Sequence, residues 1–182
     1  MKIAQKKRQE SIVEYLLYMW SVEDLIRAND LDIEKIKKNV ISQYGIADEV
    51  EKQEVVEWWD NLVEMMKREK KEKGGHVRVV QGLSNDMYNF HLYLLTQTSE
   101  AAYQNAFQAA WPDLNALMQK MPNKGEGVHH VDVAMTAVYD YYLLKMKGQT
   151  ILADTKNALL RISHFLALLS QKYLQAEKDL EK

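Results

Sequence analysis

Residues that interrupt helices are scarce along this chain, since only 7 of its 182 residues are glycine and 2 are proline. A β-sandwich or barrel carries a turn roughly every 8 to 12 residues, and turns draw heavily on these two residues. The scarcity therefore predicts an all-α protein. We expect a single-domain helical bundle of seven or eight helices over residues 1–182, with a minor boundary at Gly74–Gly75 as the alternative.

Composition and charge exclude several classes of site and partner. The chain has no cysteine, which rules out disulfides, thiolate metal sites and thiol nucleophiles. Its 24 basic and 26 acidic residues give a net charge of −2, so no global field attracts nucleic acid or anionic lipid. The sequence has no recognisable secretory signal and no apolar run long enough to span a membrane. We expect a cytoplasmic protein without a membrane partner.

Apolar residues recur at helical spacing along most of the chain. From about Ala4 to Ala28 they occupy nearly every side, which is typical of a central helix. Another helix is expected from Asp48 to Lys73. Its buried stripe has spacings of four, three and four residues and consists of Val55, Trp59, Leu62 and Met66.

Local residues predict where several helices begin and end. Asp32 and Asp48 stand where an N-cap is needed, and Gly45 is a suitable stop signal. Pro112 fits the first turn of a new helix, which would separate a fifth helix from a sixth; a kinked continuous helix is the alternative. The clearest loop is PNKGEG, residues 122–127.

The last predicted helix starts between Thr150 and Asp154 and continues almost to the end of the chain. Its apolar residues alternate three- and four-residue spacings from Leu159 to Leu180, as in a coiled coil. Leu160 and other apolar residues lie off this seam. A core helix of a bundle is therefore the simpler interpretation.

Histidines are the main candidates for a metal or polar site. Glu126 and His129 match the Glu-x-x-His spacing of bundle metal sites once, although Glu126 lies between two glycines. In a heptad assignment, His164 falls opposite the apolar seam of the last helix. His129 and His130 fall outside the apolar seam of their own helix, while His91 borders a core. We therefore expect these rings not to converge, and we predict no metal site and no cofactor.

One candidate polar site remains, formed by His91, His129, His130 and Asp132. Within it, His129 and Asp132 could act as a base and the group that orients it. No serine or threonine is recognisably placed beside them, and neither glycine pair forms a phosphate loop. We therefore assign no catalytic and no cofactor-binding residue.

Basic residues gather in the segment KREKKEKGGHVR, residues 67–78. The candidate basic patch consists of Lys67, Arg68, Lys70, Lys71, Lys73 and Arg78. Cations are favourable near the C-terminus of a helix, so a solvated helix end explains them simply. Binding of nucleic acid or an acidic partner is the alternative.

Trp58 and Trp59 are the sharpest indication of an interface. Adjacent helical residues lie about 100° apart, so both indoles cannot face one core. We expect one of them to contact another element or subunit. Other aromatic residues, including Trp111 and Tyr141, could line a ligand pocket, although helical spacing favours core positions.

Three segments carry a resemblance to a known family. They are KRQESIVEYLLYMWSVEDLIRANDLDIEKI, VDVAMTAVYDYYLLKMKG and SHFLALLSQKYL. The chain resembles an uncharacterised, all-helical family of domains of unknown function from Bacteroidetes, less so between Gly74 and Asn123. The resemblance implies a helical bundle in a bacterial cytoplasm, and it implies no activity and no site.

These observations favour a non-catalytic interaction or scaffold protein that self-associates. Its expected partner is a second copy of the chain, forming a dimer, or another helical protein. The alternative from another class is a bundle enzyme that binds a small molecule or metal. A second alternative is a helical protein that binds nucleic acid through residues 67–78.

Overall fold

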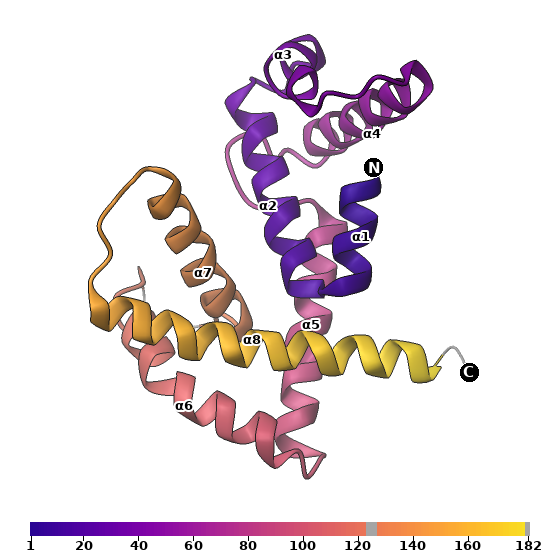
Figure 1. Ribbon diagram of the computed structural model, residues 1–182. Coiled ribbons are helices and arrows are strands. Elements are labelled where there is room, and N and C mark those ends of the chain that lie inside the picture. The colour runs from indigo at the N-terminus through magenta and orange to yellow at the C-terminus, as the bar shows by residue number, and fades with distance from the viewer. Residues whose placement is uncertain (123–126, 181–182) are drawn as a thin grey trace. The chain divides into compact units, whose positions relative to one another are not determined.

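The computed structural model describes residues 1–122 and 127–180, and the described part of the chain is built from helices (Figure 1). The elements are α1 (Lys2–Glu10), α2 (Ile12–Ala28), α3 (Ile33–Asn39), the short 3-10 helix η1 (Ile41–Tyr44), α4 (Glu49–Arg68), α5 (Arg78–Thr96), α6 (Ala101–Met118), α7 (His130–Met146) and α8 (Ala153–Leu180). The all-α class and the expected number of α-helices are confirmed. Most of the predicted PNKGEG loop lies outside the described residues.

The contacts within the chain define two compact units. Unit 1 consists of residues 1–10 and 14–82, and unit 2 of residues 11–13 and 83–182. The division falls within α5, a short distance after the predicted minor boundary at Gly74–Gly75. Whether the chain forms a single domain stays a prediction.

In unit 1, the short-range signals at the helix starts act as predicted. The carboxylate of Asp32 accepts hydrogen bonds from the backbone N–H groups of Glu34 and Lys35, and that of Asp48 accepts one from Glu51 at 2.7 Å. The stripe of α4 is buried as expected, with Trp59 and Met66 fully covered. α3 packs against α4, which closes this part of the core.

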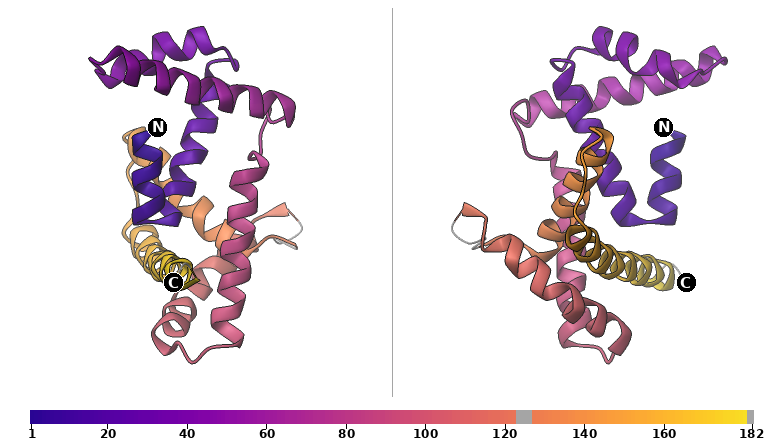
Figure 2. Two further views of the ribbon diagram at one scale, coloured as in Figure 1. Left: turned by 90° about the vertical axis from the view of Figure 1, so that its right-hand side faces the viewer. Right: turned by 60° about the vertical axis from the view of Figure 1, so that its left-hand side comes forward.

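The first helix differs from the prediction, because the expected helix from Ala4 to Ala28 is broken at Ser11 into α1 and α2 (Figures 1 and 2). The backbone N–H of Ile12 donates to Oγ of Ser170 at 2.9 Å, and the Ser11 hydroxyl lies 3.1 Å from the same oxygen. The N–H of Ile12 thus bonds to a residue of α8, whereas in a continuous helix it would bond to a backbone carbonyl of the same helix.

α4 also ends earlier than predicted, at Arg68 instead of Lys73. Lys70 adopts a left-handed backbone conformation with φ of 56°, and the N–H of Lys71 bonds back to the carbonyl of Met66. This is the hydrogen bond of a Schellman cap. The side chain of Arg27 holds the following segment by donating to the carbonyls of Lys71 and Gly75.

In unit 2, α8 packs against both α6 and α7, and α6 also contacts α7. The seam of α8 is buried from Leu159 to Leu169, whereas Leu180 at its end is exposed. The largest covered side chains of this core include Tyr103, Leu114 and Phe165. Helix α8 is therefore a core helix over its first half.

The separation expected at Pro112 does not occur, because α6 runs without a break from Ala101 to Met118. The alternative of a continuous helix is confirmed. Proline lacks only one backbone N–H, and the buried residues Ala110 and Leu114 on either side of it hold α6 in the core. Tertiary packing thus outweighs the local preference.

Candidate functional site

His91 on α5 lies at the centre of an aromatic cluster in unit 2. Its side chain is fully buried, and Nδ1 forms a 2.6 Å hydrogen bond with the hydroxyl of Tyr103 on α6. The rings of Phe107 and Phe165 lie 4.7 and 5.4 Å away, centre to centre. Burial, followed by the nearby His130, lowers the pKa of His91 from 6.5 to about 4. The imidazole is therefore neutral at pH 7.

The predicted polar site is more compact than the heptad positions indicated. The rings of His91 and His130 are 5.9 Å apart, and Tyr88 on α5 stacks on His129 at 3.9 Å. The expectation that these rings do not converge is therefore wrong for His91 and His130. His129 and His130 form the N-cap and first residue of α7, before its regular packing begins, so heptad positions do not describe them. His164 is exposed on α8, as expected.

Asp132 connects the site to α5 through a serine that the sequence did not indicate. The buried hydroxyl of Ser84 donates to Oδ1 of Asp132, while Nδ1 of His129 lies 3.8 Å from Oδ2. A nucleophilic serine needs a histidine as its base, with the carboxylate behind the histidine. Here the carboxylate stands between them, so the arrangement fixes α5 against α7 and does not activate Ser84.

Within residues 1–122 and 127–180, no three His, Asp or Glu side chains are placed to hold a metal ion together. Glu126, the acid of the Glu-x-x-His match, lies outside the described residues. Nε2 of His91 and Nδ1 of His130 are both buried, and neither has a hydrogen-bond partner among the described residues. A shallow recess lined by Phe107, Gln108, Trp111 and His130 lies beside this cluster.

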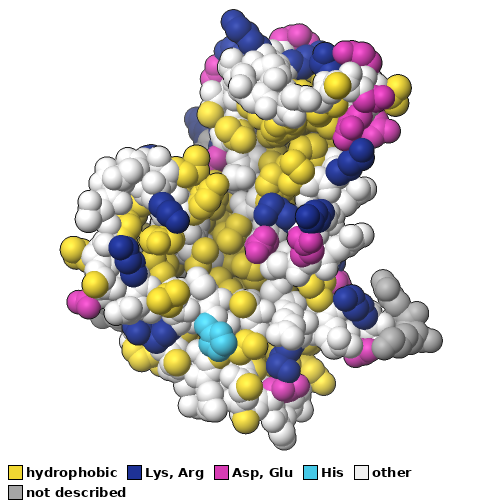
Figure 3. All heavy atoms as spheres, in the orientation of Figure 1, with side chains coloured by type: hydrophobic (Ala, Val, Ile, Leu, Met, Phe, Trp, Pro, Cys, Tyr) yellow, Lys and Arg dark blue, Asp and Glu magenta, His cyan; other side chains and the backbone are white. Residues whose placement is uncertain are grey.

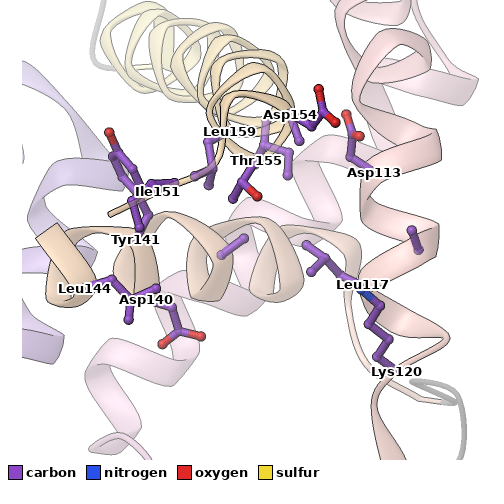
Figure 4. Close-up of a pocket in the computed structure, with 14 residues that line it drawn as sticks. Asp113, Leu117, Lys120, Asp140, Tyr141, Leu144, Ile151, Asp154, Thr155 and Leu159 are labelled. Atoms are coloured by element: carbon purple, nitrogen blue, oxygen red, sulfur yellow. The ribbon is translucent and has the colours of Figure 1, made fainter. Parts of the chain in front are cut away.

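A larger cavity, of about 410 Å³, opens among α6, α7 and α8 (Figure 4). Each of the three helices contributes an alanine to its wall, namely Ala116, Ala137 and Ala158. The remaining apolar lining residues are Leu117, Leu144, Ile151, Leu159 and Ile162, with the ring of Tyr141. Small residues facing one another leave the space, and larger apolar ones surround it. Such a cavity is in the size range of small-molecule pockets.

Polar side chains of this pocket are few. They are Asp113, Lys120, Asp140, Asp154 and Thr155. Asp113 is held by Arg161 of α8 in a bidentate ion pair, with N···O distances of 2.7 and 3.1 Å. An apolar cavity with a few charged groups is suited to hold a ligand and lacks an evident reacting group.

Apolar side chains also remain on the surface next to the pocket. Tyr142, Met146 and Leu152, near the turn between α7 and α8, are 55%, 68% and 74% exposed. Figure 3 shows apolar side chains on the surface over this end of unit 2. Residues Val131, Met135 and Tyr139 occupy the same side of α7 as Tyr142 and Met146, and they are buried. The apolar stripe thus extends beyond the packed core.

The predicted interface residues Trp58 and Trp59 take different environments in unit 1. Trp59 is fully buried, and Trp58 is half-buried with its ring edge-on to Trp59 at 5.6 Å. Of this pair, Trp58 is the residue that another element or subunit could reach.

The predicted basic patch lies on the end of α4, the following segment and the first residue of α5. Lys71 is half-buried and the other five side chains are exposed. Lys67 pairs with Glu64 at 2.8 Å, and the acidic Glu69 accepts the backbone N–H of Arg78. Neighbouring acids thus offset part of the positive charge. Binding of nucleic acid here stays a prediction.

The sequence reasoning missed a buried ionisable cluster in unit 1. Glu23 of α2 is fully buried, and its carboxylate accepts from Nδ1 of His76 at 2.6 Å and from the N–H of Val77 at 2.9 Å. The ring of His76 stacks on Trp20, with centres 4.5 Å apart. The sequence did indicate this burial, because Glu23 falls on the same helical stripe as the apolar residues Met19 and Ile26. This cluster joins α2 to the start of α5 and is structural.

No helix in the described residues is long and apolar enough to cross a membrane. Comparison with known proteins gives one match, to a family model described as a domain of unknown function, DUF4924, which covers residues 1–180. No curated protein and no solved structure matches the chain. Nearly the whole sequence lies within that match, so the chain belongs to the DUF4924 family.

Proposed function

We propose that this protein is a non-catalytic binding protein, and that the pocket among α6, α7 and α8 is its ligand site. One observation carries the proposal: a cavity of about 410 Å³ with mostly apolar walls lies within a single unit. Concave, mostly apolar pockets with a few polar groups are typical of ligand sites. The resemblance to a Bacteroidetes family supports a bacterial cytoplasm as its location.

A neutral fluorescent probe, Nile red, tests the proposal. We expect its fluorescence to rise and saturate with the purified protein, because the probe enters an apolar environment. Ala137→Leu adds three carbon atoms at the pocket wall and should weaken this binding. Ala167→Leu, at an exposed position of α8 outside the pocket, is the matched control and should leave it unchanged. Equal binding to both variants, or none to the wild type, would overturn the proposal.

Self-association is a second candidate function, favoured by the exposed end of the α7 stripe. Tyr142 and Met146 continue a buried stripe into solvent, and Leu152 lies close by in sequence. A second copy of the chain is the partner we propose, as a dimer. The net charge of −2 gives little repulsion between copies.

Light scattering over a range of micromolar concentrations tests this second function. The wild type should approach the mass of a dimer, and the double variant Met146→Lys with Leu152→Lys should remain a monomer. Leu180→Lys, at an exposed position near the end of α8, is the control. A wild type that is monomeric throughout would contradict self-association. Dissociation by Trp58→Ala instead would place the interface on unit 1.

A further inference from the structure

The charges around the pocket indicate which ligand it takes. We propose that it binds an apolar molecule that carries a cationic amine, with the ammonium group at Asp154 and the apolar body among α6, α7 and α8. This inference rests on the proposed function, because it assigns a chemical class to the ligand of the same pocket.

The lining has an excess of negative charge. Among the described lining residues, three carboxylates, those of Asp113, Asp140 and Asp154, stand against one ammonium group, that of Lys120. Arg161 neutralises Asp113 through its bidentate ion pair. Even after that pairing is counted, two carboxylates face one cation. The potential at the pocket therefore favours a cation over an anion.

Asp154 is the carboxylate best placed for the head of such a ligand. It lies in the first turn of α8, and no ion pair or hydrogen bond to it is formed by the described part of the chain. Thr155, next to it, adds a hydroxyl to the lining. In Figure 4 the carboxylates of Asp113 and Asp154 lie toward the same end of the pocket, away from Tyr141. An ammonium group has three N–H donors, and ionised carboxylates only accept.

The apolar body of the ligand would extend from that end along the alanines. Leu117, Ala137, Leu159 and Ile162 provide one apolar side chain or more from each of the three helices. Burying each methylene group of a ligand against such walls tightens binding by roughly fourfold. An alkyl chain attached to the amine therefore supplies most of the affinity, and the charge supplies the selectivity.

An anionic ligand, such as a fatty acid, is the main competitor. Lys120 is the one cation among the described lining residues, and its side chain is exposed beyond the end of α6. A carboxylate bound there would face repulsion from the unpaired carboxylates of the same lining. The observed charges thus favour the amine.

Calorimetric titration with three ligands of equal chain length tests this assignment: octylamine, octanol and octanoate. We expect octylamine to bind most tightly and octanoate most weakly. Exposed ion pairs contribute up to about 1 kcal/mol, so the advantage of octylamine over octanol should be roughly fivefold. Asp154→Asn should remove most of that advantage. Asp86→Asn, an exposed position on α5 outside the pocket, is the matched control.

The outcomes separate the ligand class from the existence of the site. Equal binding of octanol and octylamine, or tighter binding of octanoate, would overturn the amine assignment while the pocket remains a ligand site. Loss of octylamine selectivity in both aspartate variants would show that the charge of Asp154 is not its cause. If none of the three ligands binds and Nile red also fails to bind, both the assignment and the proposed function are wrong.

Discussion

Each unit of this protein contains a histidine cluster around a buried polar side chain, and the two clusters differ in how that side chain is hydrogen-bonded. In unit 1 both oxygens of Glu23 accept a hydrogen bond, from His76 and from the N–H of Val77. In unit 2 His91 forms a hydrogen bond through Nδ1 with Tyr103, and no described residue bonds to its buried Nε2. A buried charge must be paired, whereas a buried imidazole can lose its charge instead. The stability that the first cluster contributes therefore depends on its hydrogen-bond partners, and the stability that the second contributes depends on pH.

The largest expected effect is that of Glu23→Ala. The change leaves Nδ1 of His76 and the N–H of Val77 without their acceptor, and it opens a cavity on α2. A buried hydrogen-bonding group left without its partner costs about 1 to 3 kcal/mol, and the cavity adds to this loss. Urea unfolding followed by tryptophan fluorescence measures this loss, because Trp20 stacks on His76.

Glu23→Gln is the matched control, since it keeps the volume and an acceptor for Val77. It should cost clearly less than Glu23→Ala. Hydrogen exchange at the amide of Val77 should accelerate most in the alanine variant. Two variants of equal stability would contradict the prediction, because glutamine keeps both the volume and the acceptor that alanine removes.

Acid should destabilise unit 2 through His91. Its pKa in the folded protein is about 4, and an ordinary histidine titrates near 6.5. Between these values the unfolded chain binds the proton more readily, so stability is complete above pH 6.5 and is lost as the pH falls toward 4. The total loss is about 3 kcal/mol. Chemical unfolding at pH 7, 5.5 and 4.5, monitored by circular dichroism, should show a falling free energy of unfolding.

His91→Phe removes the titrating group, so this variant should show a flatter pH dependence. His164→Gln, at an exposed position of α8, should behave as the wild type. If His91→Phe does not fold, NMR titration of the wild-type imidazole still decides the matter. A His91 signal that titrates near pH 6.5 would contradict the prediction.

The smallest of these effects is expected for Ser84→Ala. The Ser84 hydroxyl donates to Asp132, whose side chain is 27% exposed, so water can replace the lost donor. We expect a loss of about 1 kcal/mol, below that of the fully buried Glu23. Thermal unfolding measures the change. A loss as large as that of Glu23→Ala would show that exposure does not distinguish the two carboxylates.

The helix map was predictable wherever the signal was local. Asp32 and Asp48 cap their helices through N–H groups two or three residues away, and the sequence alone places those groups. The break at Ser11 was not predictable, because its cause is a hydroxyl on α8, Ser170. The segment that follows the early end of α4 is likewise held from elsewhere in the chain, by the side chain of Arg27 on α2.

The candidate site was less predictable than the helices. Tyr141 and Leu144 share one face of α7 in sequence, but the pocket exists because α6 and α8 bring their own alanines against that face. The histidines were recognised as candidates, and their approach was not foreseen. Heptad positions apply to regular packed helices, and His129 and His130 lie at the start of α7.

By itself, the sequence determined that the chain is helical and where most helices lie. Scarce glycine and proline, apolar periodicity and capping residues act over a few neighbouring residues, so they can be read directly from the order of residues. Only the tertiary structure decided which polar side chains are buried together and where three helices leave a cavity. Those features arise from residues far apart in the chain, whose distances depend on how the helices pack.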